Sequence, residues 1–248
     1  MESPTTTSST HAPGGFRTTH WSAVLAATQA PGPAAAAALE TLCHAYWQPV
    51  FAHVRRQGHG VDAARDLTQE FFARLLEGRW LEPADPQRGR FRSFLLRCVS
   101  RFLIDEWRRG AAQKRGGGRE FFSLDQAREE EHWALEPADA FTPEQAYDRR
   151  WAEALIARAN ARLRAGYVAD GWEARFEALK IYLLDGQEPA AYADVAASLG
   201  LTVPAVKSAI FKLRQRFGAA IRAEIAETVS RPEEVEEELA HLLAALGG

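Results

Sequence analysis

The amino-acid sequence predicts an all-α protein with two helical domains, an acidic linker between them and a C-terminal helical extension. Apolar residues recur at three- and four-residue spacing through most of the chain, and no stretch of any length alternates as a strand does. Clusters of Gly and Pro separate the helical stretches. The chain has 248 residues, of which 46% are hydrophobic, so it can bury two small cores.

Charge and cysteine content narrow the class of protein. Lys and Arg number 30 against 33 Asp and Glu, a formal net charge of -3 that hides local asymmetry. Cys43 and Cys98 lie in apolar helical patterns without nearby Cys or His partners, so we expect neither a disulfide framework nor a zinc site. The sequence lacks a signal-peptide pattern and an apolar run of membrane-spanning length. We therefore expect a cytoplasmic protein with no metal, no other cofactor and no membrane partner.

The first predicted domain covers residues 16–119 and follows a leader. Residues 1–15 are rich in Ser, Thr, Pro and Gly, which predicts disorder. A short helix is expected over residues 21–28, and a long one follows the break at residues 31–33. Pro49 should mark a kink or a boundary in the long helix.

The next helix of this domain has one apolar and one polar face. Asp62 can cap it, and Leu67 and Phe71 fall on the apolar face. The polar face is available to a partner and carries Asp66, Gln69, Glu70 and Arg74.

The helix that begins near Phe91 carries a basic stripe. At about 100° per residue, Arg97, Arg101 and Arg108 project within roughly 40° of one another, and Arg90 is in line if the helix starts early. One positive helix face of this kind suits the phosphates of a nucleic acid.

Charge changes sign along the middle of the chain. Residues 88–119 hold ten Lys and Arg against two acids, the electrostatic footprint of nucleic-acid binding, although a solvated helix face is the alternative. Residues 120–153 hold ten acids against three basic residues. We interpret residues 120–150 as an acidic linker that is partly helical near its end.

Residues 151–230 are predicted to form a second domain with a helix-turn-helix. A short helix around Val195, a turn at Gly200 and a longer helix capped by Thr202 follow one another. The outward residues of the longer helix are Ala205, Lys207, Ser208, Lys212, Arg214 and Arg216. A short polar and basic helix suits the major groove of DNA, whereas an ordinary helical hairpin is the alternative.

Residues 231–248 should form an acidic amphipathic helix. Its apolar stripe contains Val235, Leu239, Leu242, Leu243 and Leu246. Such a stripe must pack on something, and we expect it to dock within the chain. An autoinhibitory role of this extension is a hypothesis.

These segments resemble the extracytoplasmic-function (ECF) group of the sigma-70 family. Residues 42–47 and 62–72 look like sigma regions 2.1 and 2.2, with the signature D-x-x-x-D-L-x-Q-E-x-F from Asp62 to Phe72. In that family this helix docks on the coiled coil of the polymerase β′ subunit. The resemblance therefore implies that the polymerase-binding residues are Asp66, Gln69, Glu70 and Arg74.

Residues 91–97 and 105–109 resemble regions 2.3 and 2.4, which melt and read the minus-ten element. The implied DNA-binding residues are Phe94, Arg97, Arg101, Asp105, Arg108 and Arg109. This sequence has Phe94 where the family usually has Trp and Arg101 where it usually has Asn, so the identity of the captured base does not carry over. An aromatic and cationic channel could still stack a flipped base.

Residues 191–217 resemble region 4.2, which binds the minus-thirty-five element. The implied contacts are Thr202, Ala205, Lys207, Ser208, Lys212 and Arg214. The acidic linker would then either thread toward the polymerase active centre, as sigma linkers do, or serve as a solvated tether.

The resemblance predicts an RNA polymerase sigma factor that is not an enzyme. Its partners would be bacterial RNA polymerase core, through the β′ coiled coil and the β flap, and promoter DNA; an anti-sigma factor or a Ser/Thr kinase would be further partners. Thr68 is the candidate phosphorylation site on the docking helix, with a plain helical threonine as the alternative.

Two other functions find less support in the sequence. A dimeric helix-turn-helix repressor would leave the signature from Asp62 to Phe72 unexplained. An enzyme lacks support because the sequence has no glycine-rich phosphate loop, no HExxH and no GxSxG.

Overall fold

The structure is a computed structural model that describes residues 20, 21, 24, 32–77, 90–112, 141–183 and 192–247. Within these ranges every regular element is a helix, which confirms the all-α prediction. The leader at residues 1–15, the end of the short helix at 25–28 and residues 120–140 of the expected linker lie outside the described residues.

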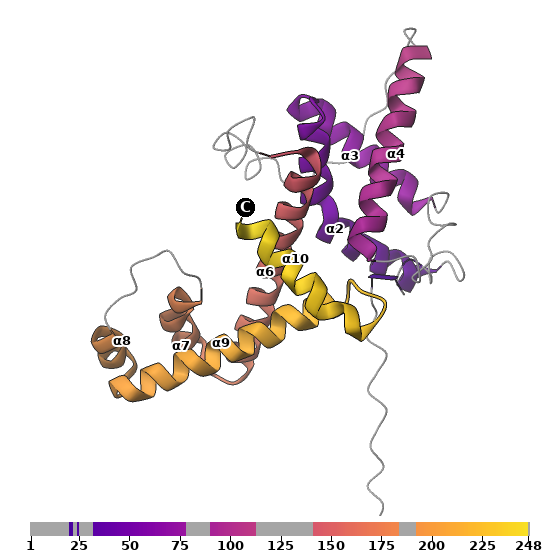
Figure 1. Ribbon diagram of the computed structural model, residues 1–248. Coiled ribbons are helices and arrows are strands. Elements are labelled where there is room, and N and C mark those ends of the chain that lie inside the picture. Colours follow the sequence, from indigo (N-terminus) through magenta and orange to yellow (C-terminus); the bar gives the residue numbers. More distant parts are fainter. Residues whose placement is uncertain are drawn as a thin grey trace, which may run out of the picture.

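After the helical residues His20, Trp21 and Val24 come α2 (Pro33–Arg56), α3 (Val61–Leu76) and α4 (Phe91–Ala112) (Figure 1). Pro49 lies inside α2, so the boundary expected there is wrong. A proline removes one backbone hydrogen bond, but Val50, Phe51 and Val54 beside it are completely buried, and their packing holds the helix together.

The cap expected at Asp62 is also wrong. The N-cap residue of α3 is Gly60, and no side chain caps the helix. Asp62 instead lies in the first turn, 3.2 Å from the Arg65 guanidinium. A carboxylate in the first turn still favours the helix through its interaction with the helix dipole.

The second part of the chain contains α6 (Pro143–Ala169), α7 (Glu173–Leu179), η2 (Lys180–Tyr182), α8 (Tyr192–Leu199) and α9 (Val203–Ala226). Thr142 caps α6 in a capping box with Gln145, with hydrogen bonds of 3.2 and 2.9 Å. The helix therefore begins within the segment expected as the end of the acidic linker.

The predicted short helix, turn and longer helix are present as α8 and α9, which are bent by 94° relative to each other. Gly200 has φ +63° in the turn, a conformation that glycine adopts without steric cost. Thr202 caps α9 as predicted, because its hydroxyl accepts a hydrogen bond from the Ala205 backbone at 3.4 Å. Among the described helices, no single one is long and apolar enough to span a membrane. Within the described residues, only α8 and α9 taken together reach that length and apolar composition.

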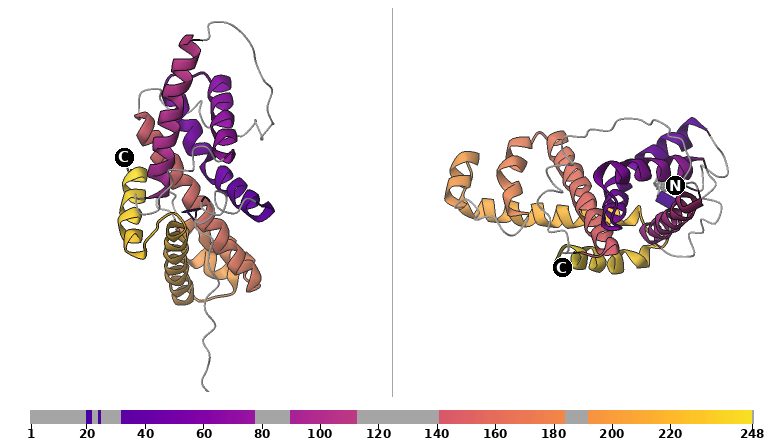
Figure 2. Two further views of the ribbon diagram at one scale, coloured as in Figure 1. Left: turned by 90° about the vertical axis from the view of Figure 1, so that its right-hand side faces the viewer. Right: turned by 90° about the horizontal axis from the view of Figure 1, so that it is seen from above.

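The C-terminal extension forms η3 (Pro232–Glu234) and α10 (Val235–Gly247), which packs on α6 and α9 (Figure 2). Leu242 is completely buried, whereas Leu243 is 62% and Leu246 38% exposed. The extension thus docks within the chain through part of its predicted stripe.

Two hydrophobic cores share two helices. The first core lies between α2, α3, α4, the first half of α6, the end of α9 and α10, and the second lies between the rest of α6, α7, α8 and the first half of α9. Ile156 of α6 and Ile221 of α9 contact both cores. The two units are therefore joined by continuous helices, as Figure 1 shows.

His20 should make the stability of the first core depend on pH. Its imidazole lies 3.3 Å from the Tyr46 hydroxyl and edge-on to the rings of Tyr46 and Phe91. Burial, assisted by the charge of Arg158, lowers the pKa of His20 from 6.5 to about 3. Below pH 6.5 the unfolded chain takes up a proton that the folded chain does not, so this contribution to stability is complete above pH 6.5 and is lost as the pH falls toward 3.

We expect the free energy of unfolding to fall below pH 6.5, by at most about 1.4 kcal/mol per pH unit for this histidine. Urea denaturation over a pH series measures this slope. His20→Gln removes the titrating group and should flatten the slope of stability against pH. Part of the slope should remain, because burial also lowers the pKa of His53. His44→Gln, on the surface of α2, is the matched control. Equal slopes for His20→Gln and the wild type would contradict the assignment.

Candidate nucleic-acid interface

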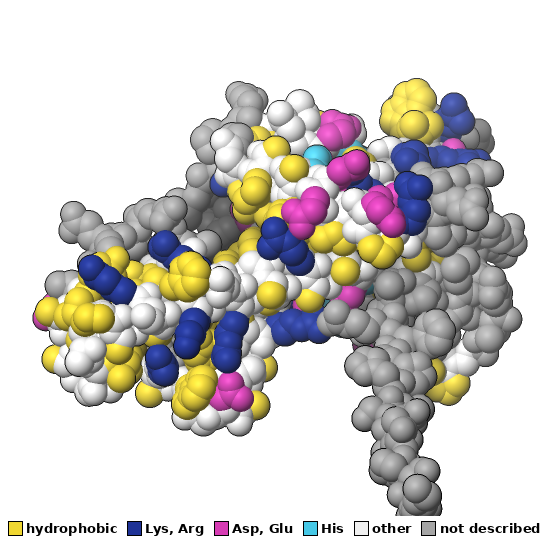
Figure 3. All heavy atoms as spheres, turned by 60° about the horizontal axis from the view of Figure 1, so that its bottom comes forward, with side chains coloured by type: hydrophobic (Ala, Val, Ile, Leu, Met, Phe, Trp, Pro, Cys, Tyr) yellow, Lys and Arg dark blue, Asp and Glu magenta, His cyan; other side chains and the backbone are white. Residues whose placement is uncertain are grey.

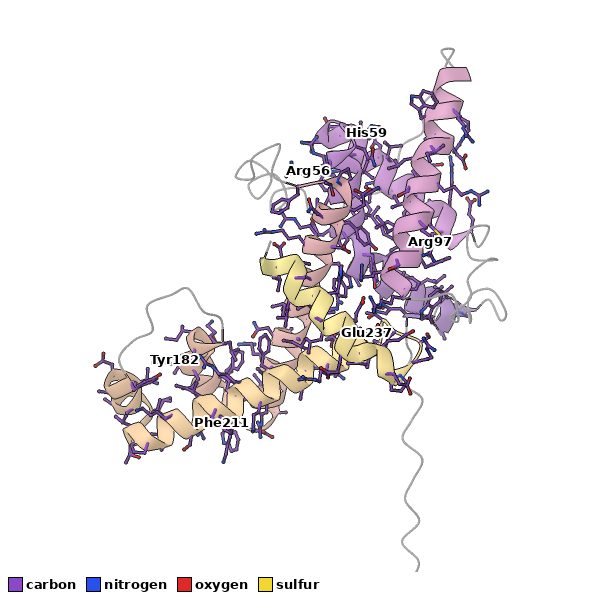
Figure 4. The ribbon with its side chains drawn as sticks, viewed as in Figure 1. Arg56, His59, Arg97, Tyr182, Phe211 and Glu237 are labelled. Atoms are coloured by element: carbon purple, nitrogen blue, oxygen red, sulfur yellow. The ribbon has the colours of Figure 1, made fainter. Side chains whose placement is uncertain are left out.

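The basic stripe of α4 lies on its solvent side. Arg97 and Arg101 are exposed, and the Arg108 side chain is 71% exposed and lies 3.9 Å from Asp105. Because α4 is a continuous helix, the spacing of Arg97, Arg101 and Arg108 puts them on one face, with Arg90 in line just before the helix. We call these four residues the α4 basic stripe. Figure 4 labels Arg97 within it.

Arg109, the other predicted DNA-binding cation of α4, is less available to DNA because it is paired within the helix. Arg109 pairs with Glu106, whose carboxylate also lies 2.7 Å from the Arg74 guanidinium. Asp105 is partly buried and carries negative charge, so it is suited to accept a hydrogen bond from a base rather than to contact phosphate.

Phe94 is in the core and not on the predicted interface. Its ring is 7% exposed and packs against Trp21 and Phe91, with centroid distances of 5.3 and 6.0 Å. The aromatic side chain that α4 presents to solvent is Trp107, which is 74% exposed. Sequence reasoning missed Trp107, although at about 100° per residue it projects away from the face that buries Phe91 and Phe102.

A groove lies beside Trp107. Its volume is about 830 Å³, and it is lined by residues of α3, α4 and α6 and by the turn after α2: Gln57, His59, Leu67, Ser100, Leu103, Ile104, Glu106, Trp107, Arg108 and Glu144. Ile104 is 51% exposed. The lining therefore combines apolar side chains with one indole, one guanidinium and two carboxylates.

The polar face of α3 is exposed in part. Asp66 is exposed and Gln69 is half-buried. Arg74 is held between two carboxylates, 2.6 Å from Glu70 and 2.7 Å from Glu106, and its guanidinium lies 5.1 Å from the centroid of a phenylalanine ring of α4. Arg74 thus links α3 to α4, and the outward charge of this face is acidic.

Thr68 is completely buried. Its hydroxyl donates a 2.7 Å hydrogen bond to the Ala64 carbonyl within α3. A kinase cannot reach this hydroxyl, and a phosphate has no room there, unless α3 leaves the core. This placement argues against the suggested phosphorylation.

The predicted DNA-binding side of α9 is largely exposed. Thr202, Lys207, Ser208, Lys212 and Arg214 are exposed, and Ala205 is partly buried. The Arg214 side chain donates to the Tyr182 carbonyl at 2.9 Å, and the Lys207 ammonium lies 5.5 Å from the centroid of the Tyr192 ring. On the face shown in Figure 3, Lys and Arg side chains lie around hydrophobic ones at the end of the molecule formed by α8 and α9.

Phe211 was missed by sequence reasoning. It is 62% exposed, and Figure 4 shows it on the side of α9 opposite Tyr182. The buried side of α9 carries Val206, Ile210 and Leu213. Helical geometry puts Ser208 and Phe211 near the middle of the outward face, with basic residues on both flanks.

In the ranges that the structure describes, His, Cys, Asp and Glu form no group of three or more that could hold a metal ion. Burial raises the pKa of the Cys98 thiol to about 11 and that of Cys43 to about 12, so both are neutral thiols at neutral pH and poor nucleophiles.

Comparison with known proteins relates the segment that carries α3 and α4 to a protein family. Residues 42–113 match the family model described as Sigma-70 region 2. Neither a comparison with curated proteins nor one with solved structures gave a match. The matched segment contains most of α2, all of α3 and α4, the basic stripe and Trp107. Residues 42–113 are therefore similar to region 2 of sigma-70 proteins, which supports a sigma factor of the sigma-70 family.

Proposed function

We propose that the chain is a sigma factor of the ECF group that binds RNA polymerase core and directs promoter recognition, DNA melting and transcription initiation, without catalysis of its own. One observation carries the proposal: the segment that matches Sigma-70 region 2 also bears the exposed basic stripe of α4. A family match alone would not require an exposed positive face, and a positive face alone would not indicate polymerase.

Polymerase binding is assigned to α3. Asp66, Gln69 and Glu70 supply its outward polar groups, and Arg74 positions Glu70 through their 2.6 Å ion pair. The resemblance names the β′ coiled coil as the surface that this helix meets, and the β flap as the partner of the second unit. An anti-sigma factor that covers α3 would compete with polymerase for the same groups.

Minus-ten recognition is assigned to α4. Arg97, Arg101 and Arg108 would follow the phosphates of the opened strand, while Trp107 would provide the stacking surface that the buried Phe94 does not offer. The neighbouring groove could receive an unstacked base.

Minus-thirty-five recognition is assigned to α9. Its first turns carry Ala205, Lys207 and Ser208, where a recognition helix meets base edges, and Lys212 and Arg214 follow toward the phosphates. The 94° bend between α8 and α9 lies within the range of helix-turn-helix units.

Reconstitution with polymerase core tests the proposal. The full chain, mixed with core enzyme and purified by gel filtration, should co-elute with it and should direct transcripts with defined start sites from a genomic library. A chain that binds DNA but never co-elutes with core would be a repressor, and the proposal would be withdrawn.

Trp107→Ala should weaken binding to single-stranded DNA about five- to a hundredfold, since stacking on one aromatic residue is worth about 1–3 kcal/mol per base. Fluorescence anisotropy with a labelled oligonucleotide measures the loss. Trp107→Phe should restore much of the affinity, and Trp172→Ala, at an exposed tryptophan of the second unit, serves as the control. Equal losses for Trp107→Ala and Trp172→Ala would remove Trp107 from the interface.

Phe211→Ala should lower the preference of α9 for thymine. An exposed phenyl ring in the middle of the outward face is suited to the thymine methyl group in the major groove. On a duplex identified by start mapping, replacing the contacted thymine by uracil removes only that methyl and should cost about fourfold in affinity. Phe211→Ala should abolish this difference and Phe211→Leu should keep part of it; a difference unchanged in Phe211→Ala would refute the contact.

A further inference from the structure

The acidic first turn of α10 lies against the start of α4. The Glu237 carboxylate is 2.7 Å from the Arg90 guanidinium. Glu238 lies 3.0 Å from Arg90 and 2.6 Å from Arg92. Figure 4 shows Glu237 on α10 near the beginning of α4, and Arg97 farther along α4. Arg90 is the first member of the α4 basic stripe, so α10 pairs with one end of that stripe.

This contact is part of the packing and not a chance surface encounter. Glu238 and Leu242 of α10 are completely buried, and the His241 imidazole lies 3.0 Å from Asp148 of α6. The chain that leads into α10 is also held at α4, because the Phe91 backbone donates a 3.2 Å hydrogen bond to the Thr228 carbonyl. The acidic turn is therefore presented to Arg90 at a fixed position and a high effective concentration.

We propose that the acidic first turn of α10 competes with DNA for the end of the α4 basic stripe. The proposal rests on the DNA-binding role of α4 given above. Carboxylate and phosphate are both anions that pair with guanidinium, so Glu237 on Nη2 of Arg90 takes the place that a phosphate would take, while Glu238 pairs with Nε. DNA that engages the whole stripe must displace Glu237 first. The competitor thus lowers the affinity of the isolated chain for DNA.

The first turn of α10 offers a matched pair of carboxylates for a test. The Glu237 side chain is 73% exposed and pairs with Arg90, whereas the Glu236 side chain is 67% exposed and pairs at 2.7 Å with Arg222 of α9. Glu237→Gln and Glu236→Gln each remove one negative charge from the same turn. Only the first frees a nitrogen of a stripe residue, because Glu237 pairs with Nη2 of Arg90 while Nε of Arg90 stays 3.0 Å from Glu238.

The experiment measures binding of the full chain to a fluorescent single-stranded DNA of mixed sequence over a range of salt concentrations. Glu237→Gln should bind about two- to fivefold more tightly than the wild type at low salt, the change that corresponds to breaking one exposed ion pair. The slope of log K against log salt should steepen by about 0.7, because one more phosphate is neutralised. Glu236→Gln should bind as the wild type does.

A double-mutant cycle tests whether the effect of Glu237→Gln on DNA affinity depends on Arg90. In an Arg90→Gln background, Glu237→Gln should no longer change the affinity, because the guanidinium that pairs with Glu237 is absent. Thermal melting checks that the variants fold, and both exposed pairs lie outside the core. Equal tightening by Glu236→Gln and Glu237→Gln, or no change in Glu237→Gln, would overturn the competition. Absence of binding by the wild type and all variants would instead refute the DNA-binding role of α4.

Discussion

Glu238→Ala is expected to lower the free energy of unfolding by about 3–5 kcal/mol, the cost of removing one partner of a buried ion pair. Glu238 is completely buried, and Arg92, with which it pairs at 2.6 Å, is only 6% exposed. The substitution leaves Asp148, 2.8 Å away, as the carboxylate still paired with Arg92. The loss should be visible as a lower midpoint in urea denaturation.

Glu237→Ala is the control for this prediction. It lies next to Glu238 but is exposed, and an exposed ion pair contributes at most about 1 kcal/mol. Glu238→Gln keeps the volume of the side chain but not its charge, and should fall between the two. If Glu238→Ala and Glu237→Ala cost the same, the buried network does not hold α10 in place.

Charge reversal at Arg97 and Arg101 should reduce run-off transcription by about tenfold or more, while binding to polymerase core is retained. Each reversal replaces attraction to a phosphate with repulsion at a position where α4 faces solvent. The polymerase-facing groups of α3 are unchanged. Transcription from a mapped promoter and gel filtration with core enzyme measure the two effects separately.

The charge-preserving pair Arg97→Lys and Arg101→Lys is the matched control. It should retain most of the transcription, because phosphate attraction depends mainly on charge. Full transcription by the Glu pair would remove α4 from promoter opening. Loss of core binding by the Glu pair would show that the stripe faces polymerase and not DNA.

The helices were predictable because their signal is local. Three- and four-residue spacing brings apolar side chains to one face whatever lies elsewhere in the chain, so α4 and the pair α8 and α9 could be read directly. The cap at Thr202 was predicted for the same reason. The predictions at Pro49 and Asp62 were wrong because packing and neighbouring residues outweighed the propensity of single residues. Buried neighbours keep α2 helical through Pro49, and Gly60 takes the N-cap position of α3 in place of Asp62.

The binding surfaces were only partly predictable. The sequence placed Arg97, Arg101 and Lys207 on outward faces, where the structure has them. It also placed Phe94 on the DNA side, because a family position was taken as exposed, and it overlooked Trp107. Exposure depends on what packs around a helix, and that information is spread over several elements.

The sequence by itself determined that the chain is helical, that residues 42–113 carry a Sigma-70 region 2 and that one face of α4 is positive. Tertiary structure decided that α6 and α9 run through both cores and that α10 folds back on the start of α4. Helix formation and helix charge follow from neighbours three or four residues apart, whereas the pairing of Arg90 with Glu237 joins residues from distant parts of the chain. Such a contact exists only once the cores have packed.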